Sequence, residues 1–170
     1  MNNVYLSLGS NIGNREKNII SALFFLQSSG CIIIKKISSF YETSPIGPRQ
    51  NEFYNIAINV LTNICSIDLL ILIKHIENIL GRKKTMKWGP RVIDIDILFF
   101  GNEIIAIDTI PGTKFNLFIP HMELQNRLFV LIPLSEIIHN FIHPILNVDI
   151  SDILKTKLLT QNQQKIKKLC

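Results

Sequence analysis

The apolar residues of the chain alternate between a two-residue and a 3.6-residue period, which predicts strands interleaved with helices. Four segments read as strands: residues 4–8, 31–41, 53–61 and 93–99. The prolines and glycine of residues 43–48 predict a rigid, irregular connection between the second and third strands.

Two helices are predicted between these strands. Asn14 is placed to cap the first, which ends before Gly30, and Ser66 is placed to cap the second, which ends at Gly81. The buried stripes predicted for the two helices are Ile19, Ile20, Leu23 and Leu26, and Leu69, Leu70, Ile73, Ile76 and Leu80.

The resulting order, β-α-β-β-α-β, predicts an α+β fold of the ferredoxin-like, split βαβ type, an antiparallel sheet with helices packed on it. Beyond Gly101 we expect a hairpin around residues 104–107, a helical stretch over 126–138 interrupted by Pro133, and a last helix over 150–157. We expect one domain over residues 1–160, followed by a solvated basic tail over 161–170.

Length and composition agree with a single domain, because 170 residues that are 47% hydrophobic can bury one core. The net charge of +5 suggests an anionic ligand, although much of the excess lies in residues 82–91 and 165–168. Cys31, Cys65 and Cys170 are scattered and odd in number, which argues against a disulfide framework and for the cytoplasm. The apolar runs fall far short of the roughly 18 residues that a membrane-spanning helix needs, so no membrane association is expected.

Candidate chemistry is concentrated at Asp94-Ile95-Asp96, on the last of the four strands. Alternate strand residues share a face, so the two carboxylates emerge together while Ile93, Ile95 and Ile97 turn to the core. Paired carboxylates suit Mg²⁺, which completes its shell with water and substrate phosphates. Six cationic residues could meet those phosphates: Arg82, Lys83, Lys84, Lys87, Arg91 and Arg127.

Each of these features also has a simpler explanation. Asp94 and Asp96 could form the polar face of an edge strand, and His121 could be a satisfied structural histidine. By pattern alone, Phe129 is a core residue, and a lone tryptophan such as Trp88 is more often core than part of a lid. The Gly9-Ser10-Asn11 segment matches no phosphate-binding fingerprint and is interpreted as a tight turn that shapes the floor of a pocket.

Several short motifs occur together in a specific order. They are Leu8-Gly9-Ser10-Asn11, Ser39-Phe40-Tyr41-Glu42-Thr43, Gly81-Arg82, Trp88-Gly89-Pro90-Arg91, Asp94-Ile95-Asp96-Ile97 and Pro120-His121. In this order and spacing the chain resembles the 6-hydroxymethyl-7,8-dihydropterin pyrophosphokinase family, nearly from its start to about Pro144.

The resemblance implies a cytoplasmic, monomeric enzyme of folate synthesis that moves the diphosphate of ATP onto the pterin hydroxymethyl group, and two Mg²⁺ ions held by Asp94 and Asp96. It implies catalytic roles for Arg82, Arg91, Asp94 and Asp96. It places Lys74, Glu77, Lys84, Lys87, Arg91, Ile97, His121 and Arg127 at ATP. It places Thr43, Ser44, Ile46, Phe53, Asn55, Trp88 and Phe129 at the pterin.

The chain departs from the family pattern in places that concern ATP. Lys74 stands where a glutamine is expected, the stretch over residues 105–118 looks lengthened, and it offers Asn116 with Lys114 nearby where a basic contact is common. Two other functions stay open. One is a small RNA-binding domain on a basic ferredoxin-like sheet, although a glycine-aromatic RNA-binding run is missing. The other is a magnesium-dependent nucleotidyl- or phosphotransferase with another substrate.

Overall fold

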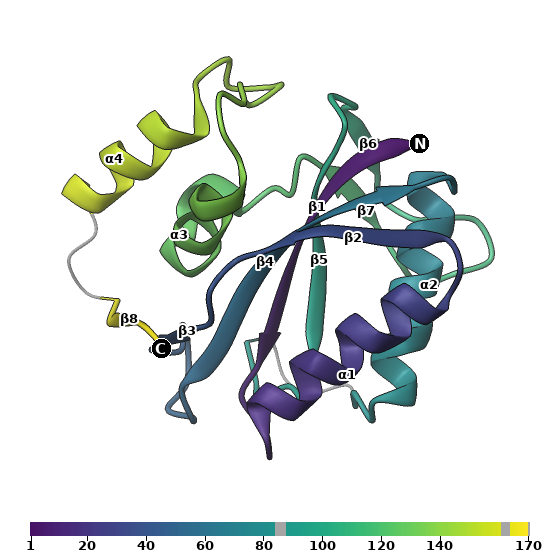
Figure 1. The fold of residues 1–170 in the computed structure, drawn as a ribbon, viewed down its shortest axis with the longest axis horizontal. Helices are drawn as coiled ribbons and strands as arrows, with labels where there is room; N and C mark the ends of the chain where they lie inside the picture. Colours follow the sequence, from purple (N-terminus) through teal and green to yellow (C-terminus); the bar gives the residue numbers. More distant parts are fainter. Residues whose placement is uncertain (84–87, 161–163, 170) are drawn as a thin grey trace.

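The computed structural model describes residues 1–83, 88–160 and 164–169 (Figure 1). Along the chain its elements are β1 (Asn2–Ser10), α1 (Arg15–Ser28), β2 (Ile32–Ile37), β3 (Tyr41–Thr43), β4 (Phe53–Thr62), α2 (Ser66–Ile79), β5 (Asp94–Phe100), β6 (Ile105–Ile107), β7 (Leu117–Ile119), the 3-10 helix η1 (Leu124–Asn126), α3 (Leu128–Ile137), α4 (Ile150–Thr160) and β8 (Ile166–Lys168).

Within the described residues, six strands form one antiparallel sheet in the order β5-β1-β4-β3-β8, and β2 also pairs with β4. The long strands β1 and β4 form its centre, and α1 and α2 cover one face (Figure 1). The predicted β-α-β-β-α-β order and the antiparallel, ferredoxin-like α+β sheet are therefore confirmed.

The second predicted strand is divided in two. β2 and β3 both pair with β4, and residues 38–40 separate them. At this break the Ser38 hydroxyl accepts a hydrogen bond from the Ala57 amide (2.9 Å), and the Ser39 amide donates to Glu136 of α3 (2.6 Å). The interruption therefore joins the sheet to α3, a contact between distant parts of the chain that local periodicity does not encode.

Strand alternation gives the sheet two apolar faces. One core cluster contains residues such as Leu6, Leu8, Ile56 and Ile95 together with α1 and α2. The other contains Tyr5, Ala57, Leu98 and Phe99 together with buried residues of α3 and α4: Val130, Leu131, Leu134, Ile137, Ile150 and Ile153. Because α3 and α4 cover only part of this second face, its remaining part, toward the start of β5, is available for a site.

The first two helices follow the sequence with two corrections. Asn14 caps α1 as predicted, accepting a hydrogen bond from the Lys17 amide (3.0 Å). The cap residue of α2 is Cys65, without a side-chain cap bond, because Ser66 already lies in the first turn. Ile20 is 51% exposed, so α1 buries a narrower stripe of Ile19, Ala22 and Leu26.

The second half of the chain also follows the expected outline. β6 and β7 form the predicted hairpin, with a longer connection than expected. Pro133 does not interrupt α3, which is continuous over residues 128–137. A proline inside a helix costs about 3 kcal/mol, and burial of Val130, Leu131 and Leu134 against the sheet offsets that cost.

In the part of the predicted tail that the structure describes, residues 166–168 pair with β3 as strand β8, while Lys167 and Lys168 stay exposed. A tail of alternating lysines and apolar residues reads as solvated, but β3 offers it an unpaired sheet edge. Among the described residues, none of the helices combines the length and the apolar content needed to cross a membrane.

Candidate active site

The candidate site is an open pocket on the second face of the sheet, with an empty volume of about 720 Å³ including its mouth. It lies between the start of β5, the end of β3 and the start of α3. Its lining residues are Ser7, Gly9, Thr43, Ser44, Pro45, Ile46, Phe53, Asn55, Trp88, Gly89, Arg91, Asp94, Asp96, Arg127 and Phe129.

Strand β5 places both predicted carboxylates on the pocket face. Asp94 lies opposite Gly9 of β1 and Asp96 opposite Ser7, while Ile95 and Ile97 enter the core beneath α2. The predicted alternation is confirmed. The acids are thus carried by a strand whose other face is anchored among buried apolar residues.

Asp94 is held between two arginines. Its Oδ1 lies 2.8 Å from Arg82 Nη1, and its Oδ2 is paired with Arg91. Burial alone would raise the pKa of Asp94, but the positive charges of Arg82 and Arg91 outweigh it and hold this pKa below its ordinary value. Asp94 is therefore a carboxylate at neutral pH.

Asp96 has looser partners. Its Oδ2 lies 3.7 Å from both His121 Nε2 and Arg127 Nη1, beyond hydrogen-bonding distance. Burial, and then the negative charge of Asp94, raise the pKa of Asp96 above its ordinary value. A cation between these two carboxylates would relieve this repulsion.

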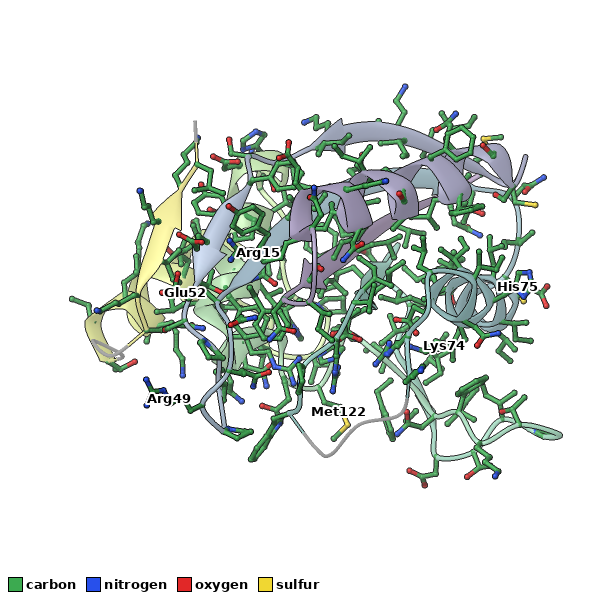
Figure 2. All side chains as sticks on the ribbon, turned by 90° about the horizontal axis from the view of Figure 1, so that it is seen from below. Arg15, Arg49, Glu52, Lys74, His75 and Met122 are labelled. Carbon is green, nitrogen blue, oxygen red and sulfur yellow. The ribbon has the colours of Figure 1, made fainter. Side chains whose placement is uncertain are left out.

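Glu77 of α2 supports the acids from behind. It is 2% exposed, accepts a hydrogen bond from the Ile95 amide (2.8 Å), and is paired with Arg82 and with Lys74 Nζ (2.9 Å). Figure 2 shows Lys74 pointing from α2 toward the middle of the molecule and His75 pointing away from it. Glu77, which the family resemblance places at ATP, therefore anchors β5 and Arg82.

His121 and Arg127 lie beside Asp96, between β7 and α3. His121 Nδ1 accepts a hydrogen bond from the Glu123 amide (3.2 Å), which leaves Nε2 as the protonated nitrogen of the neutral ring, directed at Asp96. The Arg127 guanidinium lies 5.8 Å from the centre of the Phe129 ring. Arg127 lines the pocket, and His121 lies beside Asp96 without lining the pocket.

Another wall of the pocket carries the apolar side chains of Ile46, Phe53 and Phe129 and one polar anchor, Asn55. Asn55 is 3% exposed, and its Nδ2 donates to Thr43 Oγ1 (2.8 Å), which orients the amide with Oδ1 as an acceptor. A side chain on Gly9 would place its Cβ 2.7 Å from that Oδ1. Gly9 belongs to strand β1 and not to a turn, and it is glycine because Asn55 occupies the adjacent space.

Two loops close the pocket on the side of Trp88. Gln50 Nε2 donates to the Trp88 carbonyl (2.7 Å), and a Cβ on Gly47, whose φ is +99°, would lie 3.0 Å from the Trp88 Cβ. Buried Asn11 fixes the segment that ends at Arg91. Its side-chain Oδ1 accepts from the Arg91 backbone amide (2.7 Å), and its backbone amide donates to the Arg91 carbonyl (3.0 Å). The segment 47–50 and residues 88–91 are thus held together.

The structure brings most of the predicted residues together and separates a few. All seven residues assigned to the pterin line the pocket, as do Arg91, Asp94, Asp96 and Arg127. The Ile97 side chain lies in the core, so only its backbone is available to a nucleotide. Lys84 and Lys87 lie outside the described residues.

The sequence reasoning missed residues that act through their backbone or small size. Ser7, Pro45 and Gly89 line the pocket, and Asn11 holds Arg91. Ser7 and Gly9 lie two and four residues after Tyr5 in β1, on the face of the sheet that holds the pocket. Their spacing could have identified Ser7. Nothing local indicates that Asn11 reaches Arg91, 80 residues away.

Comparisons with known proteins agree with this geometry. The sequence model of 7,8-dihydro-6-hydroxymethylpterin-pyrophosphokinase (HPPK) matches residues 5–139. The chain is 42% identical over 139 residues to the 2-amino-4-hydroxy-6-hydroxymethyldihydropteridine pyrophosphokinase of Bacillus subtilis, covering 81% of this chain and 79% of that protein. It is 43% identical over 141 residues to the Bifunctional protein FolKE of Lactococcus lactis, covering 82% of this chain.

Some of these relatives are much longer. The chain spans only 38% of the Lactococcus protein. A crystal structure of Plasmodium falciparum HPPK-DHPS aligns with a TM-score of 0.73 at 20% identity, over 92% of this chain and 43% of that one. At that identity the alignment supports the fold.

Proposed function

Since the chain belongs to the 7,8-dihydro-6-hydroxymethylpterin-pyrophosphokinase family, we propose that it transfers the terminal diphosphate of ATP to the hydroxymethyl group of 6-hydroxymethyl-7,8-dihydropterin. The products are AMP and the pterin diphosphate, an intermediate of folate biosynthesis. The observation that carries this proposal is one pocket lined both by the aromatic residues Phe53 and Phe129 and by the carboxylates Asp94 and Asp96.

The aromatic side of the pocket suits the pterin ring. Phe53 and Phe129 line the pocket and offer ring faces for stacking. Asn55, oriented by Thr43, presents an acceptor to the ring N–H groups. Discrimination by a buried, pre-oriented amide is strong because an analogue without the matching group leaves that amide unpaired.

The acidic side suits Mg²⁺ and phosphates. Among the described residues, no group of three or more His, Cys, Asp or Glu side chains could hold a metal ion. Mg²⁺ commonly takes only one or two carboxylates and fills its shell with water and substrate phosphates, so the donor set fits. Asp94 and Asp96 would hold two ions, which polarise the phosphate oxygens and offset their charge.

The cationic residues bind and position the triphosphate. Arg82 and Arg91 already converge on Asp94, and a phosphate that replaced part of these contacts would find two planar donor forks. His121 Nε2–H, Arg127 and Lys74 add donors around Asp96 and α2. Lys84 and Lys87 are proposed to contribute from the intervening loop. Positioning and charge neutralisation supply most of the catalysis in such transfers.

Trp88 is proposed to exclude water from the reacting groups. It lines the pocket at the start of the segment that leads to Arg91. Closing this segment over the ring would expel solvent and strengthen each charge contact inside.

We propose that a monomer is the active form, which light scattering can check. A cytoplasmic location stays a prediction.

Product analysis tests the proposal. The purified chain is incubated with Mg²⁺, ATP and the hydroxymethyl-dihydropterin, and the nucleotides are separated. We expect AMP and pterin diphosphate in equal amounts, and none of either without the pterin. ADP or pyrophosphate as product would indicate a different transferase, and RNA binding without turnover would indicate a binding domain.

A further inference from the structure

The chain continues well beyond residue 139, where the family match ends, and its last described strand returns to the pocket. β8 pairs antiparallel with β3 in the register Tyr41 with Lys168, Glu42 with Lys167 and Thr43 with Ile166. β3 leads directly into the pocket wall at Thr43 and Ser44. β8 therefore lies next to that wall, as the neighbour of β3 in the sheet.

Ser44 is held by residues 164 and 165, which directly precede β8, through its amide, its carbonyl and its hydroxyl. Its amide donates to the Lys165 carbonyl (2.9 Å), its carbonyl accepts from Gln164 Nε2 (3.2 Å), and its Oγ accepts from the Lys165 amide (3.1 Å). Three hydrogen bonds to two consecutive residues fix both the backbone and the rotamer of a residue that lines the pocket.

The other end of β8 is fastened as well. The Leu169 amide donates to the Phe40 carbonyl (2.8 Å), and Lys168 Nζ lies 2.5 Å from Glu136 Oε1. Glu136 also accepts from the Ser39 amide (2.6 Å) and from the Tyr41 hydroxyl (2.8 Å). β8 is thus tied to both ends of β3, on one side through α3.

Without β8, the three residues of β3 would be an edge strand paired only with β4. Fixing the backbone of a residue costs conformational entropy. A ligand that must order Thr43 and Ser44 on binding loses that free energy from its affinity, whereas a wall ordered beforehand does not take it from the ligand.

We propose that β8 is a positioning element of the substrate pocket, which holds Thr43 and Ser44 in the conformation that receives the flat pterin ring. The identity of the ligand rests on the proposed function; the mechanical support does not. The nucleotide side is built from α2, β5 and residues 121–127, and β8 does not touch these elements through any hydrogen bond or ion pair of the described residues.

Truncation after Thr160 tests the role directly. Loss of the hydrogen bonds that hold Ser44, only partly expressed in binding, should raise the Kd and KM for the pterin about tenfold. The Kd of an ATP analogue, measured without pterin, and kcat should stay within about twofold of the parent values. The side chains proposed to bind ATP and Mg²⁺ keep their hydrogen-bond and ion-pair partners in the truncated chain. An unchanged pterin Kd in the truncated chain would overturn the proposal.

A matched pair of point variants separates support from charge and from general folding. Lys165→Pro and Lys165→Ala both remove one positive charge, but only proline lacks the amide that binds Ser44 Oγ. We expect a pterin Kd about threefold higher for the proline variant and close to that of the parent chain for the alanine variant. Equal affinities of the two variants would contradict the role of β8.

Addition of a peptide with the sequence of residues 160–170 should restore pterin affinity to the truncated chain, as a strand added to the free edge of β3. Failure of the parent chain to bind any pterin would refute the proposed function. Tight binding by the parent chain together with equal binding by the truncated one would refute the inference alone.

Discussion

The buried carboxylate of Glu77 accepts a hydrogen bond from the backbone amide of Ile95, 2.8 Å away, the residue between the two pocket carboxylates. The same carboxylate pairs with Arg82, which in turn pairs with Asp94. One side chain of α2 therefore sets both the position of β5 and the orientation of a phosphate-binding candidate.

Glu77→Gln keeps an acceptor for the Ile95 amide but removes the negative charge between Arg82 and Lys74. A hydrogen bond to a charged group is worth about 1.5–3 kcal/mol, so we expect the free energy of unfolding to fall by about 2 kcal/mol. Glu77→Ala should cost more, because it also leaves the Ile95 amide without its acceptor. Denaturant unfolding measures both, and equal midpoints for parent and Glu77→Gln would contradict the anchoring role.

Asp96→Asn should separate activity from stability. Losing one of two metal-binding carboxylates should lower kcat/KM by about 10²–10³, or roughly 3–4 kcal/mol. The raised pKa of Asp96 means that its ionised form is disfavoured in the folded state, so the variant should be at least as stable as the parent at pH 7. Asp108→Asn, on the exposed end of the β6–β7 hairpin, is the control. Near-normal turnover by Asp96→Asn would exclude the assigned metal role.

Gly9→Ala should weaken pterin binding through Asn55. The new Cβ would lie 2.7 Å from Asn55 Oδ1, so the amide must move and its bond to Thr43 Oγ1 must lengthen. We expect a stability loss of about 1–3 kcal/mol from overpacking and a clear rise in the pterin Kd by fluorescence titration. In an Asn55→Ala background the same change should cost much less, since the pair is in contact. Additive effects would show that Gly9 acts elsewhere.

Glu136 should make stability depend on acid pH. Burial raises the pKa of Glu136, but hydrogen bonds from Lys168, Ser39 and Tyr41 outweigh it and lower the pKa from 4.5 to about 2. A lowered folded-state pKa stabilises the fold above the unfolded pKa, and this contribution disappears as pH falls from 4.5 toward 2. Glu136→Gln should therefore be less stable than the parent at pH 7, by a margin that narrows below pH 4.5. A margin that is constant with pH would refute this assignment.

Local pattern was enough to predict the central part of the fold. The alternation around Asp94 and Asp96 gave the correct face for both acids, and Asn14 gave the correct start of α1. The pocket-lining positions of Thr43, Phe53 and Asn55 followed from family resemblance, because these residues have ordinary strand patterns and show their common face only once β3 and β4 are paired.

Long-range partners could not be predicted. Glu77 has the sequence context of an exposed helix residue near a C-terminus, yet it is buried against β5 because Arg82 and Lys74 neutralise it there. Residues 165–168 have the composition of a solvated tail, and only the free edge of β3 makes them a strand. Both outcomes depend on which surfaces meet in three dimensions, which local periodicity does not specify.

The two sides of the pocket are anchored in different apolar clusters, one on each face of the sheet. Asp94 and Asp96 are anchored through Ile95 in the first, whereas Phe129 belongs to the helix that forms the second. Proteins open locally in cooperative units of unequal stability. If α3 and α4 detach as one such unit, the ring-binding side would come apart while the acidic strand stays assembled, so native-state hydrogen exchange should find α3 amides opening before those of β5.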